Sequence, residues 1–142
     1  MILLDTNVVS ALMQRDADPS VIDWLDAQPP ESIWTTSITV FEVRFGIEIL
    51  ALGRRRRLLE ESFQAMLEED LEGRIVAFDE TAAQAAGRIA AERRRLGRPV
   101  EIRDLQIAGI AAARRAAIAT RNVRHFEGLG LALIDPWAAK PR

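Results

Sequence analysis

Four oxygen-bearing side chains, Asp5, Glu42, Asp104 and Asn122, occupy positions at which they can act together. Asp5 directly follows an apolar segment that predicts a buried strand, and Asn122 follows the fourth predicted strand. Glu42 lies on the helix after the second strand, and Asp104 lies in the first turn of the helix before the fourth. Because sites in open α/β sheets form beyond the carboxyl ends of the strands, these side chains are expected to converge there.

Clustered carboxylates indicate the binding of a hard metal ion. Mg²⁺ and Mn²⁺ prefer oxygen ligands, and Mg²⁺ is often bound by one or two carboxylates together with a substrate phosphate. Without an ion, Asp5, Glu42 and Asp104 would repel one another and would also repel a polyanion. The pattern therefore predicts a metal site for phosphodiester chemistry.

Each of these residues also has a plainer interpretation. Asp5 fits the cap of a helix that begins near Val8. Asp104 fits an ordinary acidic residue of a first helical turn, and Glu42 a solvated helix residue. Asn122 fits a turn position that tolerates a left-handed backbone. Their shared location, rather than any single residue, favours a site.

Three further polar residues lie near these positions. Thr6 and Asn7 follow Asp5 and also fit ordinary helix-start residues. His125 is the only histidine, and a lone histidine on a loop is more often a surface or packing residue than a catalyst. The sequence contains no glycine-rich phosphate loop with its lysine, and no nucleophile with a nearby base.

Alternating strands and helices must position these side chains. Strands are predicted at residues 2–4, 32–36, 74–78 and 117–120, with a fifth at 131–134. The predicted helices cover residues 8–13, a segment from Pro19 to the sequence QPPE, 38–52, a segment around 59–67 closed at Gly73, 79–97 and 103–116. This order predicts one α/β domain over residues 1–142, with a largely parallel central sheet of four to five strands flanked by helices.

One helix carries an apolar stripe at helical spacing, with Glu42 at its edge. Its members, which we expect to be buried, are Ile38, Phe41, Phe45, Ile49 and Leu52. Gly46, one turn beyond Glu42, leaves that side of the helix free of bulk.

Composition excludes several classes of protein. The 142 residues suffice for one sizeable core, and 49% of them are apolar. No apolar run reaches the roughly 18 residues of a membrane span. The N-terminus lacks the basic stretch of a secretory signal. Without cysteine there is no disulfide framework and no thiolate metal site, so a cytoplasmic location is expected.

The basic residues are clustered although the net charge is only −2. Lys140 is the only lysine among 19 basic residues, and arginines form runs at 54–57 and 93–95. Such runs usually cover solvated helix faces. They also suit a phosphate-binding surface, because the planar guanidinium matches phosphate oxygens.

Four segments together resemble one protein family. LLDTNVVS, ITVFEVRFGI, IRDLQIAGIA and ATRNVRHFEGLGLALIDPW are similar, in order and spacing, to the PIN-domain VapC toxins of type II toxin–antitoxin systems, in their FitB-like branch. The resemblance implies a Mg²⁺- or Mn²⁺-dependent ribonuclease toxin that forms a homodimer and is inhibited by a cognate VapB-like antitoxin. Operator DNA would be a partner through the antitoxin.

The resemblance also implies roles for individual residues. Asp5 and Asp104 correspond to metal-binding acids and Glu42 to the third acid, while Thr6 and Asn7 complete the first motif. Thr120 would orient the site through its hydroxyl.

At the fourth acidic position this chain differs from the FitB-like pattern. FitB-like proteins often carry Asp where Asn122 stands, and many relatives carry Asp where His125 stands. Asn122 completes the expected catalytic set with one negative charge fewer, which implies a weaker or single-metal site.

Two other functions stay open on the sequence alone. One is a catalytically weak module that serves, with its antitoxin, in a DNA-binding regulatory complex. The other is a PIN nuclease that processes rRNA or DNA structures. For the toxin, Arg44, Arg103 and Arg121 are candidates for contact with the RNA backbone, and the helices between Ile38 and Leu71 are candidates for an antitoxin-binding groove.

Overall fold

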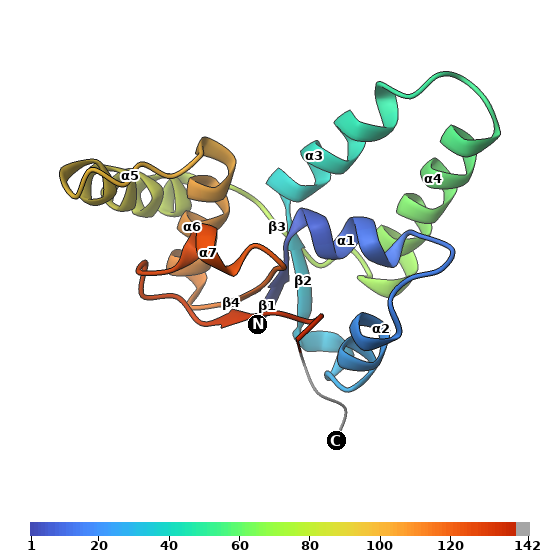
Figure 1. The fold of residues 1–142 in the computed structure, drawn as a ribbon, viewed down its shortest axis with the longest axis horizontal. Helices are drawn as coiled ribbons and strands as arrows, with labels where there is room; N and C mark the ends of the chain where they lie inside the picture. The colour runs from blue at the N-terminus through green and yellow to red at the C-terminus, as the bar shows by residue number, and fades with distance from the viewer. Residues whose placement is uncertain (139–142) are drawn as a thin grey trace.

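Five short parallel strands form one sheet in the order β3-β2-β1-β4-β5 in the computed structural model, which describes residues 1–138 (Figure 1). The strands are β1 (Ile2–Leu4), β2 (Ile33–Thr36), β3 (Ile75–Val76), β4 (Ala117–Ala119) and β5 (Leu133–Ile134). β1 is the central strand, and its Leu3 pairs with Trp34 of β2 on one side and Ile118 of β4 on the other. The predicted α/β fold with a parallel sheet is confirmed.

Helices cover both faces of the sheet (Figure 1). One group contains α1 (Thr6–Leu12), α2 (Pro19–Asp26), α3 (Ser37–Glu48) and α4 (Arg54–Ala65), which continues as the π-helix η2 (Met66–Asp70). The other contains α5 (Glu80–Arg95), α6 (Ile102–Arg114) and the single turn α7 (Val123–Phe126). A 3₁₀ turn, η1 (Pro30–Ser32), precedes β2.

The alternation of side chains along β1 divides the core into two parts. Leu4 packs with Val8, Phe63 and other residues of the first helical group. Leu3 packs instead with Ile107, Phe126 and their neighbours in the second group. Because apolar side chains leave both faces, β1 is buried and its carboxyl end lies at a fixed place between the two layers.

Most predicted elements are present, with shorter bounds. The third strand was predicted over 74–78 and comprises only Ile75–Val76, and the helix predicted over 103–116 ends at Arg114. Arg115 adopts a left-handed conformation with φ of 53°, which turns the chain into β4. The helix predicted to reach Leu52 ends at Glu48. Gly53 is the cap of α4 and not the end of α3.

The prediction of a buried stripe on α3 is wrong for most of its members. Phe41, Phe45, Ile49 and Leu52 are exposed to 56%, 51%, 68% and 87%. The buried face of α3 is formed by Thr39, Val43 and Ile47. Since α3 carries two apolar faces, spacing identified a stripe but did not identify which stripe meets the core.

Two further sequence expectations concern the whole chain. Within the described residues, no helix is long and apolar enough to cross a membrane. The extent of the domain over residues 1–142 stays a prediction, because residues 139–142 lie outside the part that the structure describes.

Candidate active site

The order of the strands creates a switch point between β1 and β4. The chain builds outward from β1 to β2 and β3, then crosses to β4 and β5 on the other side. Ligands in open α/β sheets bind at such a point, beyond the carboxyl ends of the strands. Asp5 follows β1 and Thr120 follows β4, and the Asp5 amide donates to the Ala119 carbonyl at 2.9 Å.

Asp5 is held by several donors. Its Oδ2 accepts a hydrogen bond from the Thr120 hydroxyl at 2.7 Å, and its Oδ1 accepts one from the Thr6 amide at 2.8 Å. The Asn7 side-chain amide donates to Oδ2 at 3.3 Å. Asp5 is only 5% exposed and caps α1. The capping interpretation is therefore correct as far as it goes, but a cap alone explains neither the buried Thr120 bond nor the bond from Asn7.

The Asn7 and Asn122 residues connect the two strand ends differently. The Asn7 side-chain oxygen accepts from the Arg121 amide at 3.0 Å. The Asn122 backbone amide donates to Thr120 Oγ1 at 3.0 Å, while its side chain is exposed beside a hollow of about 370 Å³. The alternative that Asn122 tolerates a left-handed turn is wrong, because its φ is −93°.

Glu42 lies beside this network and is linked to it through Thr6. The Thr6 hydroxyl donates to Glu42 Oε1 at 2.9 Å, and Arg103 Nη1 lies 3.5 Å from Glu42 Oε2. Fully buried Thr39 lies 3.3 Å from the Thr6 hydroxyl. Thr39 was missed by sequence reasoning, although its spacing of three residues from Glu42 places both on one face of α3.

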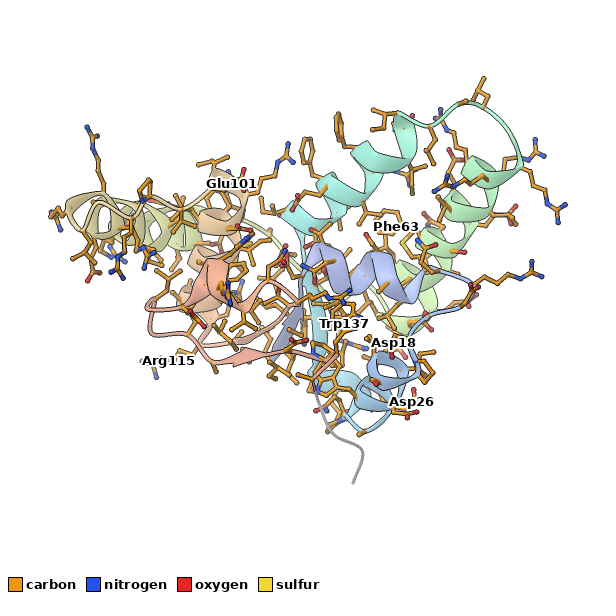
Figure 2. All side chains as sticks on the ribbon, in the orientation of Figure 1. Asp18, Asp26, Phe63, Glu101, Arg115 and Trp137 are labelled. Carbon is orange, nitrogen blue, oxygen red and sulfur yellow. The ribbon has the colours of Figure 1, made fainter. Side chains whose placement is uncertain are left out.

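Asp104 reaches the same region from the first turn of α6. Glu101 caps α6 by accepting from the amides of Arg103 and Asp104. Figure 2 labels Glu101 at the start of α6, next to the beginning of α3. Because Glu101 provides the cap, Asp104 is free for another role, and its Oδ2 lies 3.0 Å from Nδ1 of His125 on α7.

The electrostatics of the two aspartates favour a cation. Burial raises the pKa of Asp5, against the opposing effects of the Thr120, Thr6 and Asn7 bonds and of His125. Partial burial raises the pKa of Asp104, and the charge of Asp5 raises it further, while His125 lowers it. Two carboxylates that each disfavour the other's charge are stabilised by a cation between or beside them.

The donor set fits a magnesium-like ion with few protein ligands. Within residues 1–138, no group of three or more acidic, histidine or cysteine side chains is gathered closely enough to enclose an ion. Asp5 lies close enough to Asp104 for its charge to raise the pKa of Asp104. Glu42 instead accepts a hydrogen bond from Thr6 and pairs with Arg103. The pair of Asp5 and Asp104 suits Mg²⁺, which keeps several waters and binds through one or two carboxylates.

Comparison with known proteins agrees with this arrangement. The PIN domain family profile matches residues 2–129. The chain belongs to the PIN-domain family. This PIN domain is 40% identical to plasmid stability protein StbB of Pseudomonas syringae pv. tomato, over 98% of this chain and 100% of that protein. It is 36% identical to VapC ribonuclease Y4jK of Sinorhizobium fredii, over 96% and 98% of the two chains.

A solved structure confirms the similarity of fold. The structure of FitAB bound to an IR36 DNA fragment contains a chain that matches this one with a TM-score of 0.89 and 31% sequence identity. The match covers 100% of this chain and 99% of that chain.

Two of the three arginines predicted to contact RNA flank the site of this PIN domain. Arg103 pairs with Glu42 and lies over the Phe41 ring. Arg121 lies 4.9 Å from the centre of the Trp137 ring, which is labelled in Figure 2. Arg44 instead lies over the Phe63 ring of α4, so it lies on the α4 side of α3. RNA contact by these arginines stays a prediction.

Proposed function

We propose that this protein is the toxin of a type II toxin–antitoxin pair and hydrolyses RNA phosphodiester bonds with Mg²⁺ or Mn²⁺. One observation carries the proposal: Asp5 and Asp104 lie near one another at the switch point of the sheet, where burial raises the pKa of both and the charge of Asp5 raises the pKa of Asp104 further. Similarity to the VapC ribonuclease supports the reaction class. PIN nucleases generally depend on a divalent metal.

The site residues would divide the work as follows. Asp5 and Asp104 would hold the ion, which supplies charge stabilisation at phosphorus and a more acidic water when bound. Thr120 and Asn7 hold the Asp5 carboxylate in one orientation. Glu42, fixed by Thr6 and Arg103, would orient the attacking water. The exposed amide of Asn122 would contact a bound water or the substrate.

Asp5→Asn tests this proposal against simple helix capping, with Asp18→Asn as the matched control. Both aspartates are helix N-caps, of α1 and α2, and Asn caps a helix as well as Asp does. Asp18, labelled in Figure 2, accepts from the Ser20 amide at 2.9 Å. Growth arrest on expression should persist with Asp18→Asn and disappear with Asp5→Asn at equal protein level.

A direct cleavage assay on RNA, with and without Mg²⁺ or Mn²⁺, accompanies the growth assay. An Asp5→Asn variant that remains folded and fully toxic would contradict the proposal.

A second candidate function is a catalytically weak PIN module in a regulatory complex. Asn122 favours it, because an amide there contributes no charge to the metal site, and so does the similarity to FitAB bound to DNA. Operator binding by the complex without any metal-dependent cleavage by the free toxin would identify this function.

An antitoxin helix would dock on α4 and the end of α1. A hollow of about 690 Å³ is lined there by Met13, Gln14, Arg15, Arg54, Arg55, Leu58, Leu59 and Ser62. Leu58 offers an exposed apolar contact. The arginines in the first turn of α4 interact unfavourably with the positive end of the helix dipole. Acidic side chains of a partner helix would offset this repulsion. The hollow uses α4, one of the two helices that the sequence suggested for this role.

The exposed face of α3 supports homodimer formation. Phe41 and Phe45 stack with their ring centres 6.3 Å apart, and Ile49 and Leu52, which follow the end of α3, are exposed as well. Such a row can pack against its own symmetry-related copy. The face is continuous with the active site, because Arg103 covers the Phe41 ring. A two-fold contact here would place two active sites beside one shared surface.

A further inference from the structure

A polar hollow borders the active site without including its aspartates. It has a volume of about 370 Å³, and its charged and polar lining residues are Arg121, Asn122, Arg124, His125, Glu127 and Asp135. The Arg121 backbone amide donates at 3.0 Å to the Asn7 side chain, which in turn donates to Asp5. His125 is hydrogen-bonded to Asp104. An RNA strand whose scissile phosphate lies at the two aspartates therefore has a neighbouring nucleotide beside this hollow.

The hollow presents charges of both signs that do not pair with each other. Within residues 1–138, neither Arg121 nor Asp135 forms an ion pair. Asp135 Oδ1 accepts a hydrogen bond from the Trp137 amide at 2.9 Å, which leaves Oδ2 for another donor. The Arg121 guanidinium lies 4.9 Å from the centre of the Trp137 ring (Figure 2), and this attraction holds the exposed cation in place.

This mixture of groups suits a nucleobase better than a phosphate. Phosphate oxygens only accept hydrogen bonds, so a carboxylate beside them is unfavourable. A base edge carries donors and acceptors, and the bases of single-stranded RNA are open to recognition on these edges. The volume of the hollow is within the range of about 300–1,000 Å³ that is usual for small-ligand sites.

Among the four bases, guanine is the best match to an arginine and a carboxylate. Its O6 and N7 accept from a guanidinium, and its N1–H and N2–H donate to a carboxylate. Adenine and cytosine place an acceptor nitrogen where guanine has N1–H, so they would repel a carboxylate at that edge. Uracil offers a single N–H between two carbonyl oxygens.

We propose that this hollow binds a guanine next to the scissile phosphate, with Asp135 accepting from N1–H and N2–H and Arg121 donating to O6 and N7. This inference rests on the proposed RNA cleavage and deepens it, because it assigns residues that determine where the strand is cut. Trp137 is then a positioning residue, since it holds the Arg121 side chain and does not contact the base.

The experiment measures cleavage and binding of single-stranded RNA by the antitoxin-free protein. Sequencing of the products that wild type forms from randomised RNA with Mn²⁺ identifies the bases beside the cut. The selected guanine is then replaced by adenine, by inosine, which lacks the N2 amino group, or by 7-deazaguanine, which lacks N7. Fluorescence anisotropy with Asp5→Asn protein measures the binding of the same RNAs without cleavage.

We expect guanine at one fixed position beside the cut. Adenine there should lower kcat/KM by about 5- to 150-fold, the discrimination that a bidentate contact to a base edge provides. Inosine and 7-deazaguanine should each cause part of this loss. Arg121→Gln should abolish the effect of 7-deazaguanine but keep that of inosine.

Asp135→Asn tests the carboxylate, with Asp18→Asn as the matched control. Asp135 and Asp18 each accept at 2.9 Å from the amide two residues later, a turn that Asn also forms. The ratio of guanine to adenine should fall to about one in Asp135→Asn, in cleavage and in binding. It should be unchanged in Asp18→Asn.

Different outcomes overturn different claims. Cleavage without base preference, or a preference that Asp135→Asn keeps, would overturn the guanine site and leave the proposed nuclease intact. If Asp135→Asn keeps the base preference but loses affinity for the antitoxin, the hollow belongs to the protein partner and the inference is wrong. Absence of cleavage of any RNA would overturn the proposed nuclease, and the anisotropy ratio would then decide separately whether the hollow binds guanine.

Discussion

At Gly109, α6 packs closely against α5. Replacing this glycine should lower the stability of the protein and disturb the active site. A Cβ at this position would lie 2.5 Å from the Ala82 carbonyl oxygen, 2.6 Å from Ala86 Cβ and 2.9 Å from the Ala86 amide nitrogen. Ordinary contacts of this kind are 3.4–4 Å. Gly109→Ala must therefore separate the two helices by about 1 Å, because two of the three atoms are backbone.

The matched control is Gly87→Ala on α5. Both glycines are inside helices, but nothing lies within 4 Å of a Cβ at Gly87. Alanine there should stabilise the protein by about 0.8–1 kcal/mol through helix propensity. The same gain applies to Gly109→Ala, but overpacking costs about 1–3 kcal/mol, and backbone contacts favour the upper end. We expect a net loss of about 1–2 kcal/mol.

Urea unfolding followed by circular dichroism measures this difference. The two variants should differ by about 2–3 kcal/mol, or about 8–12 °C in Tm at about 4 °C per kcal/mol for a chain of this size. Asp104 lies on the same helix as Gly109, so displacement of α6 should also weaken Mn²⁺ binding in Gly109→Ala alone. A Gly109→Ala protein as stable as Gly87→Ala, with unchanged metal affinity, would refute the close packing on which this reasoning depends.

Three other substitutions test the site and its surroundings. Asp104→Asn should stabilise the metal-free protein at neutral pH and abolish metal binding. The folded state holds the Asp104 proton more tightly than the unfolded chain does, so the stability of the wild type should fall as the pH rises from the ordinary pKa of 3.8 through the raised value. Unfolding free energies measured from pH 4 to 8 should show a smaller fall in Asp104→Asn. Thr120→Val removes the buried hydroxyl that donates to Asp5, so it should destabilise the protein by about 1–3 kcal/mol and weaken metal binding. The control is Thr35→Val, which breaks a buried hydrogen bond to the Leu4 carbonyl. It should lower the stability measured by urea unfolding but leave the metal titration unchanged. Phe45→Glu should convert a homodimer to a monomer, as measured by light scattering, with little change in Tm because Phe45 is half exposed. A monomeric wild type, or a variant that remains dimeric, would refute the α3 interface.

Local patterns were sufficient to predict the architecture. The apolar run at Ile2–Leu4 and the alternation of helical and extended segments predicted a parallel α/β sheet, and the sheet is present. Position after the strands also placed Asp5 and Asn122 at one edge, because all parallel strands end on the same side. These inferences need only side-chain periodicity and strand direction, which are local properties of the chain.

Partners distant in the chain were not predictable in this way. The bond between Asp5 and Thr120 spans 115 positions, and the contact between Asp104 and His125 depends on how α6 and α7 pack. The sequence around His125 gives no indication that Asp104, 21 positions earlier, lies next to it. Glu42 was expected beside the aspartates; its bond from the Thr6 hydroxyl and its ion pair with Arg103 could not be predicted from local patterns.

The stripe on α3 illustrates the same limit. Periodicity identified Phe41, Phe45 and Ile49 as one face, but α3 also carries Val43 and Ile47 on another. The sheet accepts only one face of a helix, and the sequence of α3 alone contains no information about which face is nearer. By itself the sequence determined the elements, their order and the end of the sheet at which chemistry can occur. Tertiary packing decided which side chains meet there and which apolar face is left for a partner, because both depend on contacts between segments that the chain brings together only on folding.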